Sequence, residues 1–385
     1  MHYGRTCCIA CLSPGSEQYH RGESTVRIGI NGFGRIGRLI LRSALERGVD
    51  LDIVAINDRG DAAINAHLFQ YDSTYGPFRG QVEADDEHII INSRPIAIVS
   101  HLNPLDIPWR DLGVELVIEA TGAFTTSEQA AAHLQAGASR VLVTAPCKGG
   151  DVTLVAGVNE HDYKPSEHQI ISAASCTTNC LAPVAKVLQD HFGIRQGIMN
   201  TIHAYTNDQR ILDRSHTDPR RARAAAENII PTTTGATKAL GQVIPSLVGK
   251  FHGVSYRVPT ITVSVVDLIV ELECEATVQE VNRTFALSSA GPLNGILGYC
   301  QLPLVSSDFR GDSRSSIVDG LMTAKLPERN TMRIVAWYDN EWGYASRVVD
   351  VANFLSECDS PGERPACVRV VRREQVEQAM NSLWL

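Results

Sequence analysis

The stretch TVRIGINGFGRIG, residues 25–37, decides the fold of the first part of the chain. It begins as a short apolar run, turns through Gly32, Gly34 and Gly37, and continues as an amphipathic helical pattern. A G-x-G-x-x-G spacing between a strand and a helix permits a tight turn and brings a pyrophosphate close to the backbone at the helix N-terminus. The stretch therefore predicts a dinucleotide-binding unit, and the alternative is a glycine turn used only for packing.

The acid that completes such a site is expected at the end of the following strand. Asp58 closes the run DIVAIN, residues 52–57, about 20 residues after the last glycine, where a carboxylate accepts hydrogen bonds from ribose hydroxyls. Its charge favours NAD, but Arg59 beside it could balance a 2′-phosphate, so NADP also remains open. The residues expected to bind the dinucleotide here are Gly32, Phe33, Gly34, Arg35, Ile36, Gly37, Asp58 and Arg59.

Strand and helix patterns outside this stretch predict an α/β protein of two folded parts. Short β-branched runs alternate with helical patterns up to about residue 174, which is typical of a Rossmann-type domain with a parallel sheet. Longer strands follow, notably over residues 256–273 and 331–341, and indicate an α+β domain with a mainly antiparallel sheet. The predicted division is a disordered leader (1–24), a dinucleotide-binding domain (25–174, with a returning helix at 342–357), a second domain (175–341) and a C-terminal extension (358–385).

The bulk composition excludes several classes of protein. The chain has 385 residues, a formal net charge of −8 and 44% hydrophobic residues, an ordinary composition for a soluble protein. It has no long basic block for nucleic acid and no apolar run near the roughly 20 residues of a membrane span. Its ten cysteines are too sparse for a disulfide scaffold, and Cys8-x-x-Cys11 lacks a second pair for zinc. We expect a cytoplasmic protein with no nucleic-acid, membrane or metal partner.

The chemical centre is expected at the sequence SCTTNC, residues 175–180. A β-like run ends before it and a helical pattern follows, so Cys176 is predicted at a helix N-terminus, where the dipole and free backbone N–H groups lower the pKa of a thiol. The same N–H groups can hold an oxyanion or a phosphate, and neighbouring hydroxyls add donors. Cys180, one turn later, is expected to be a buried or redox-coupled second thiol.

A reactive cysteine also needs a base, and the best candidate is His203 in the strand-like run MNTIHAYT, residues 199–206. Taken alone, a histidine in such surroundings is more often a satisfied core residue than a catalytic one.

Six motifs together resemble the phosphorylating glyceraldehyde-3-phosphate dehydrogenases: INGFGRIG (30–37), SCTTNCLAP (175–183), TIHAYTNDQ (201–209), RRARAAAENIIPTTTGATKA (220–239), RVPT (257–260) and WYDNEWGY (337–344). The resemblance implies that Cys176 attacks the aldehyde of glyceraldehyde 3-phosphate while His203 takes the hydroxyl proton. Hydride then passes to NAD(P), and inorganic phosphate releases 1,3-bisphosphoglycerate from the resulting thioester. The reaction is reversible, so the sequence does not give its physiological direction.

The same resemblance implies roles for further residues. The C3 phosphate of the substrate would be bound by Thr206 and Arg257. Inorganic phosphate would be bound by Ser175, Thr177, Thr234, Gly235 and Arg223. The cofactor cleft would be lined by Thr121, Gly122, Asn340 and Tyr344, with Asn340 on the nicotinamide carboxamide.

The segment 206–228 resembles the family loop that reaches a neighbouring subunit's cofactor in a homotetramer. NAD-preferring members commonly carry a proline before the histidine of this loop, whereas this chain has Ser215 before His216, as NADP-accepting photosynthetic members do. With Asp58 retained, we expect use of both cofactors.

The ends of the chain depart from the family pattern. Cys358 and Cys367 enclose eight residues, a spacing that resembles the redox tail of a chloroplast subunit and of its small regulatory partner, although this tail is basic where the family's is acidic. A regulatory disulfide, with such a redox partner, and a pair of solvated thiols therefore both remain open.

Two other functions also remain. Erythrose-4-phosphate dehydrogenase shares the cysteine and the histidine but tends to lack the threonine found here as Thr206. A non-catalytic regulatory protein on the same fold predicts damage to the site, and the sequence shows none.

Overall fold

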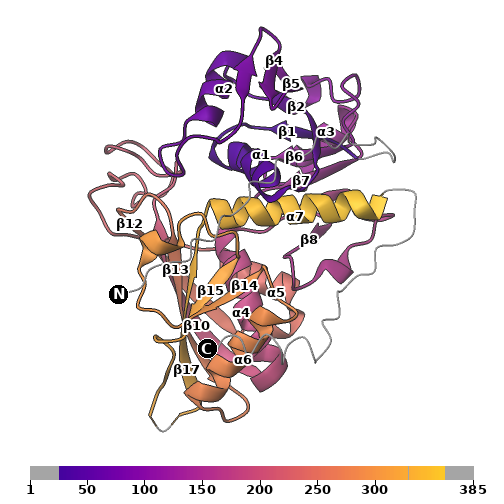
Figure 1. Cartoon of the computed structure of the whole chain (residues 1–385). Helices are drawn as coiled ribbons and strands as arrows, with labels where there is room; N and C mark the ends of the chain where they lie inside the picture. The colour runs from indigo at the N-terminus through magenta and orange to yellow at the C-terminus, as the bar shows by residue number, and fades with distance from the viewer. Residues whose placement is uncertain (1–25, 328, 360–385) are drawn as a thin grey trace, which may run out of the picture.

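The computed structural model describes residues 26–327 and 329–359, and it contains two β-sheets with helices packed against them (Figure 1). The predicted leader at 1–24 lies outside these residues, and so does the predicted extension beyond its first two residues. Cys8 and Cys11, the pair considered for zinc binding, lie in this leader and so outside the described residues. Within the described ranges, no helix has the length and apolar character to cross a bilayer.

The first sheet is built around the glycine-rich stretch. Its order is β3-β4-β5-β2-β1-β6-β7-β9-β8, and all its pairs from β5 to β8 are parallel. The strands are β1 (Arg27–Asn31), β2 (Asp52–Asn57), β3 (Val82–Ala84), β4 (His88–Ile91), β5 (Arg94–Val99), β6 (Leu116–Glu119), β7 (Arg140–Val143), β8 (Val152–Thr153) and β9 (Ile170–Ser172). The helices are α1 (Arg35–Arg47), α2 (Ala62–Gln70) and α3 (Ser127–Gln135). Because parallel strands need crossover connections, this half is the Rossmann-type fold that the alternating pattern predicts.

The second sheet is mainly antiparallel, as predicted. Its order is β11-β12-β10-β13-β17-β15-β14, with β16 paired to β17; only β10–β12 and β14–β15 are parallel. The strands are β10 (Ile194–Ala204), β11 (Ile230–Thr233), β12 (Phe251–Val258), β13 (Ser264–Leu272), β14 (Leu297–Cys300), β15 (Ser316–Asp319), β16 (Ala324–Lys325) and β17 (Thr331–Tyr338). The helices α4 (Cys176–Phe192), α5 (Ala236–Val243) and α6 (Val278–Ala290) share its hydrophobic core.

One strand prediction was wrong. The run 256–273 forms two strands, β12 and β13, on opposite sides of β10. Pro259 has no backbone N–H to donate, and Val263 has φ 69°, so the chain leaves the sheet between them.

The last helix, α7 (Trp342–Asp359), returns to the first half of the molecule. It packs along α1, and Val348, Val349 and Leu355 join the same core as the β1 residues Ile28 and Ile30. Figure 1 shows α7 as the yellow helix lying between the two sheets. Because only three residues separate β17 from this helix, the end of β17 is held close to the first sheet.

Candidate active site

In the glycine-rich turn, two glycines are required because neighbouring atoms leave no space for a side chain, and a third faces open space. Gly32 has φ 93°, and a Cβ there would lie 2.7 Å from the backbone N of Thr121. A Cβ on Gly37 would lie 2.2 Å from the carbonyl oxygen of Gly32, whereas one on Gly34 would meet nothing within 4 Å. Gly34 is also the N-cap of α1, without a side-chain cap. The turn therefore leaves open space beside uncapped N–H groups, which fits a dinucleotide pyrophosphate and not packing alone.

Asp58 lies beside this turn, at the carboxyl end of β2. Its carboxylate accepts hydrogen bonds from the backbone N–H groups of Phe33, at 2.8 Å, and Gly60, at 3.0 Å. The Phe33 ring is buried and stacks on Phe69, with 6.1 Å between ring centroids, so only its backbone faces the turn. The next residue, Arg59, is exposed.

The side chain of Arg35, which the sequence assigns to cofactor binding, pairs with two carboxylates of the protein. Its Nε lies 2.9 Å from Glu341 Oε1 and its Nη1 lies 2.6 Å from Asp72 Oδ2. Burial opposes the charged form, but the two carboxylates outweigh it and raise the pKa of Arg35. The guanidinium therefore joins α1 to the segment after β17, and only the backbone of Arg35 and Ile36 remains for a pyrophosphate.

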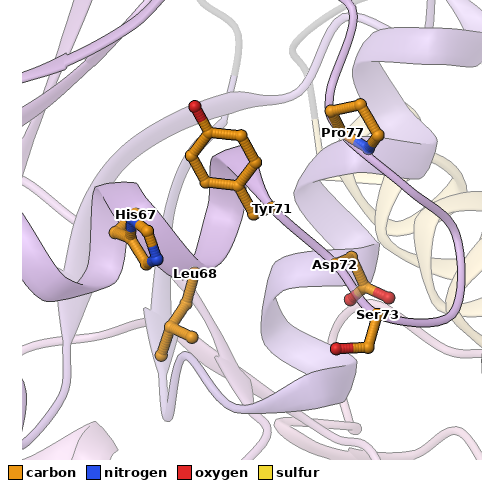
Figure 2. A pocket seen from close by; sticks show the side chains of 6 residues that line it. All are labelled: His67, Leu68, Tyr71, Asp72, Ser73 and Pro77. Atoms are coloured by element: carbon orange, nitrogen blue, oxygen red, sulfur yellow. The ribbon is translucent and has the colours of Figure 1, made fainter.

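The structure also has a shallow pocket of about 340 Å³ near the end of α2 (Figure 2). It is lined by His67, Leu68, Tyr71, Asp72, Ser73 and Pro77. It contains no residue of the predicted site, and its carboxylate, Asp72, is already paired with Arg35. The candidate active site lies instead around Cys176.

Several contacts fix the turn that carries Cys176. Ser175 is the N-cap of α4, and its Oγ accepts from the backbone N–H of Thr178 at 3.1 Å. Ala174 has φ 55°, and its carbonyl accepts from the hydroxyl of Tyr344 at 3.0 Å. Tyr344 thus supports the turn before the nucleophile. These contacts explain why Cys176 begins α4 at a fixed position, as the sequence predicts.

The structure brings Cys176 and His203 together. Cys176 Sγ lies 3.4 Å from His203 Nε2. On the other side of the ring, Nδ1 lies 2.6 Å from the carbonyl oxygen of Ala204, which can only accept, and 2.9 Å from Arg257 Nη1, which can only donate. The shorter contact, with the carbonyl, favours the tautomer with its proton on Nδ1. In neutral His203, Nε2 is then free to accept a proton from the thiol. His203 is thus buried and hydrogen-bonded, yet its second nitrogen faces the sulfur.

Tyr338, the last residue of β17, contacts the residues that carry the Cys176–His203 pair. Its hydroxyl lies 3.0 Å from Thr177 Oγ1 and 2.8 Å from Thr201 Oγ1, and its ring meets the His203 ring at 73°. The predicted phosphate ligand Thr177 therefore shares its hydroxyl with Tyr338. Tyr338 was missed from the sequence, although it is the second residue of the quoted WYDNEWGY motif.

The protonation of the pair differs from the prediction made from the helix terminus. Burial raises the pKa of the Cys176 thiol, although the Arg257 charge and hydrogen bonds at the start of α4 oppose this. Burial, followed by the charge of Arg257, lowers the pKa of His203 to about 3. Desolvation therefore opposes each separate charge, the thiolate and the imidazolium. The thiol proton can then move to Nε2 as sulfur attacks.

Arg257 and Thr206 lie together beside this pair. Arg257 Nη1 lies 3.5 Å from Thr206 Oγ1 and 2.9 Å from His203 Nδ1. Two buried donors, Arg257 Nε and Gln209 Nε2, have no hydrogen-bond partner among the residues that the structure describes. Buried donors are rarely left unpaired in a native protein, so the site suits an anionic ligand. Gln209 was also missed, although it lies three residues beyond Thr206 in the same motif.

Arg223 is not brought to this site. Its side chain is 61% exposed and pairs with Asp213 at 2.8 Å. Arg221 is the arginine that points inward: its Nε donates to Thr232 at 2.9 Å, and its charge helps lower the pKa values of His203 and Arg257, after burial. The motif RRAR offers alternate arginines, and only the fold decides which one faces inward.

The remaining predicted residues lie at the ends of elements. Gly235 is the N-cap of α5, which packs on α4, and Thr234 Oγ1 accepts from Ala236 N at 3.2 Å. Thr121 follows β6; its backbone N–H donates to Glu119 at 2.8 Å, and the exposed Gly122 follows with φ 72°.

The other cysteines do not complete the site. Cys180 is fully buried with its Sγ 3.9 Å from the carbonyl oxygen of Ala336, and burial raises its pKa well above the usual value. It is not bonded to Cys176. Cys367 lies outside the described residues, so a disulfide with Cys358 and a pair of separate thiols both stay open.

Comparison with known proteins shows the family of the chain. The family model of the glyceraldehyde 3-phosphate dehydrogenase NAD binding domain matches residues 26–127, and that of the C-terminal domain matches residues 175–340. The glyceraldehyde-3-phosphate dehydrogenase 2 of Streptomyces avermitilis is 53% identical over 331 residues, 86% of this chain and 98% of the relative. The glyceraldehyde-3-phosphate dehydrogenase of Geobacillus stearothermophilus is 51% identical and glyceraldehyde-3-phosphate dehydrogenase 2 of Trichormus variabilis is 52% identical, covering 86% of this chain and 98% and 99% of theirs. The chain belongs to the glyceraldehyde 3-phosphate dehydrogenase family.

Proposed function

We propose that this chain catalyses the reversible, NAD-dependent oxidation and phosphorylation of glyceraldehyde 3-phosphate to 1,3-bisphosphoglycerate. The observation that carries the proposal is the 3.4 Å contact between Cys176 Sγ and His203 Nε2 beside the unpaired donor of Arg257. A thiol, a base and an anion site are the groups that covalent oxidation of a phosphorylated aldehyde requires.

Each step of the proposed reaction is assigned to particular groups of the chain. Cys176 adds to the aldehyde carbon as its proton moves to His203 Nε2, and α4 backbone N–H groups stabilise the oxyanion. The protonated His203 gives its proton to the oxyanion, and Nε2 takes it back from the resulting hydroxyl as hydride leaves the same carbon. This leaves a thioester on Cys176 and the proton on His203. Phosphate oxygen then attacks the thioester carbonyl, and the sulfur leaves as thiolate. Bound NAD supplies the hydride acceptor.

Two anion sites are needed, one for each phosphate. The Thr206–Arg257 contact and the spare donor of Gln209 support binding of the substrate's C3 phosphate. Erythrose 4-phosphate is a poorer candidate because the dehydrogenase for that substrate tends to lack the threonine that contacts Arg257 here, Thr206. For inorganic phosphate we propose Ser175, Thr177, Thr234, Gly235 and Arg221, with Arg221 replacing Arg223. The inward position of Arg221 supports this change.

We further propose that the enzyme accepts NADP as well as NAD. We assign the binding of the dinucleotide to Gly34, Asp58, Thr121 and Asn340, and the open space at Gly34 supports this assignment. The exposed Arg59 beside Asp58 supports NADP use, as does Ser215 in the loop. The same loop and the family suggest a homotetramer, and the composition suggests a cytoplasmic location. The spacing of Cys358 and Cys367 suggests a redox-regulatory partner.

The proposed function is tested by reduced-cofactor formation from glyceraldehyde 3-phosphate, with NAD or NADP and with or without phosphate. We expect activity that depends on phosphate and is lost in Cys176→Ser. Equal turnover of erythrose 4-phosphate would contradict the substrate assignment. A kcat/KM ratio above about a thousandfold for NAD over NADP would contradict use of both cofactors.

A further inference from the structure

Asn340 is the residue proposed to bind the nicotinamide carboxamide. Within the described residues, only the oxygen of its side-chain amide makes a hydrogen bond. Asn340 follows β17 and is 4% exposed. Its Oδ1 accepts a hydrogen bond from the hydroxyl of Ser264 at 2.9 Å. Its Nδ2 makes no hydrogen bond to any residue that the structure describes. An amide whose N–H groups have no acceptor among the described residues has donors to offer a ligand.

Ser264 has one hydroxyl proton, and its surroundings determine where that proton goes. Its Oγ accepts from the backbone N–H of Ala204 at 3.1 Å, which occupies one lone pair. Within the described residues, Asn340 Oδ1 is the acceptor for the hydroxyl proton. If the amide turned over, Nδ2 would face Ser264, and that proton would lose its acceptor. The hydroxyl therefore distinguishes the two ends of the Asn340 amide.

The position of Ser264 is itself tightly held. It begins β13, is 1% exposed and lies opposite Tyr338 in the register of β13 and β17. The residue before it, Val263, has φ 69° and is buried against Phe309 and Ile317. A β-branched residue persists in this backbone region only where the surrounding packing fixes it.

We propose that Ser264 is a positioning residue that keeps Asn340 Nδ2 toward the cofactor cleft, so that the cofactor carboxamide is recognised through its carbonyl oxygen. The proposal deepens the proposed function and rests on it. It also links the cofactor end of the site to the base, because Ser264 holds Ala204, whose carbonyl fixes the His203 ring.

The test compares NAD with 3-acetylpyridine adenine dinucleotide, which keeps the carbonyl oxygen but lacks the amide N–H groups. An N–H donor on Asn340 can bind the carbonyl oxygen of either cofactor. An Asn340 with Oδ1 toward the cleft can accept only from the carboxamide of NAD. The ratio of the analogue KM to the NAD KM therefore reports the orientation of Asn340.

In Ser264→Ala we expect this ratio to rise about threefold to tenfold over wild type, the effect of one hydrogen bond. Ser316→Ala is the matched control, because Ser316 is a fully buried serine of the same sheet whose hydroxyl lacks a partner within the described residues. A ratio within about twofold of wild type in Ser264→Ala overturns the proposal, even if both KM values rise together.

A second variant keeps the test decisive if Ser264→Ala does not fold. Asn340→Asp offers acceptors alone, so the ratio should rise in the same way, and an unchanged ratio overturns the proposal. Both cofactors carry the same charge, so the new carboxylate affects them alike. Wild-type protein inactive with NAD would instead refute the proposed function.

Discussion

At the scale of single residues, reactivity at Cys176 depends on its neighbours more than on its helix terminus. Burial raises the pKa of the Cys176 thiol, and His203 Nδ1 contacts the Ala204 carbonyl, which leaves Nε2 to take the thiol proton. Helix N-termini do favour thiolates, but that stabilisation competes here with desolvation, which a sequence cannot reveal.

The role of His203 predicts how thiol alkylation depends on pH. In His203→Asn, Cys176 keeps the raised pKa that burial gives it but loses its proton acceptor. We therefore expect the midpoint of the iodoacetamide reaction rate to move to higher pH by about one unit or more. His252→Asn, an exposed substitution on neighbouring β12, should leave the midpoint in place. An unshifted midpoint in His203→Asn would contradict the assignment of the base.

The two arginines of the loop provide a matched pair. Arg221→Gln should raise the KM for inorganic phosphate about tenfold or more, because it removes a charge close to the reacting pair. Arg223→Gln removes only the surface pair with Asp213 and should change this KM less than about threefold. Steady-state kinetics at varied phosphate measure both values. A larger effect in Arg223→Gln would restore the original sequence-based assignment.

At the scale of elements, the β1–α1 turn combines a packing requirement with a binding one. Gly32 and Gly37 are required because neighbouring backbone atoms occupy the space of a side chain, whereas Gly34 faces open space. The motif spacing predicts all three glycines but not this division of roles.

The turn predicts different consequences for two alanine substitutions. Gly37→Ala places a Cβ against the Gly32 carbonyl, so we expect the free energy of unfolding to fall by about 3 kcal/mol. Gly34→Ala should change it by less than about 1 kcal/mol but raise the KM for NAD, since the new methyl group occupies the pyrophosphate space. Urea unfolding and cofactor kinetics measure these effects. Equal destabilisation by both substitutions would contradict this division.

The sequence predicted most elements because their patterns are local. The β1–α1 turn, the start of α4 at Cys176 and the return of α7 all follow from apolar spacing, glycines or resemblance. The break between β12 and β13 was missed because β-branched residues continue through it from Thr260 to Val263, although Pro259 marks it in the sequence. Likewise Arg35 was assigned to the cofactor because its partners, Asp72 and Glu341, are distant in sequence.

At the scale of the whole molecule, contacts between the two halves hold the cofactor and substrate sites in register. Arg35 joins α1 to Glu341, and the hydroxyl of Tyr75 donates to Asp339 at 2.8 Å. Both acids flank Asn340. The N-terminal turn and the amide proposed for the nicotinamide are therefore tied to each other without a ligand.

The second sheet also predicts assembly. Its face opposite the helices carries Ile198 on β10 and Ile269 on β13, which lie opposite each other in register and are 54% and 36% exposed. Burial of such a face would stabilise a homotetramer. Ile198→Asp should shift the mass measured by light scattering toward smaller species, whereas Ile64→Asp, on exposed α2, should not. A monomeric wild-type protein would contradict this assembly.

The central claim is that Cys176 carries an acyl group that phosphate removes. It is tested most directly by mixing enzyme, NAD and glyceraldehyde 3-phosphate without phosphate, then following reduced cofactor and the intact protein mass. We predict a burst of one reduced cofactor per subunit, a 3-phosphoglyceroyl adduct on Cys176, and turnover only after phosphate is added. Sustained turnover without phosphate, or an adduct that forms unchanged in Cys176→Ser, would contradict the account.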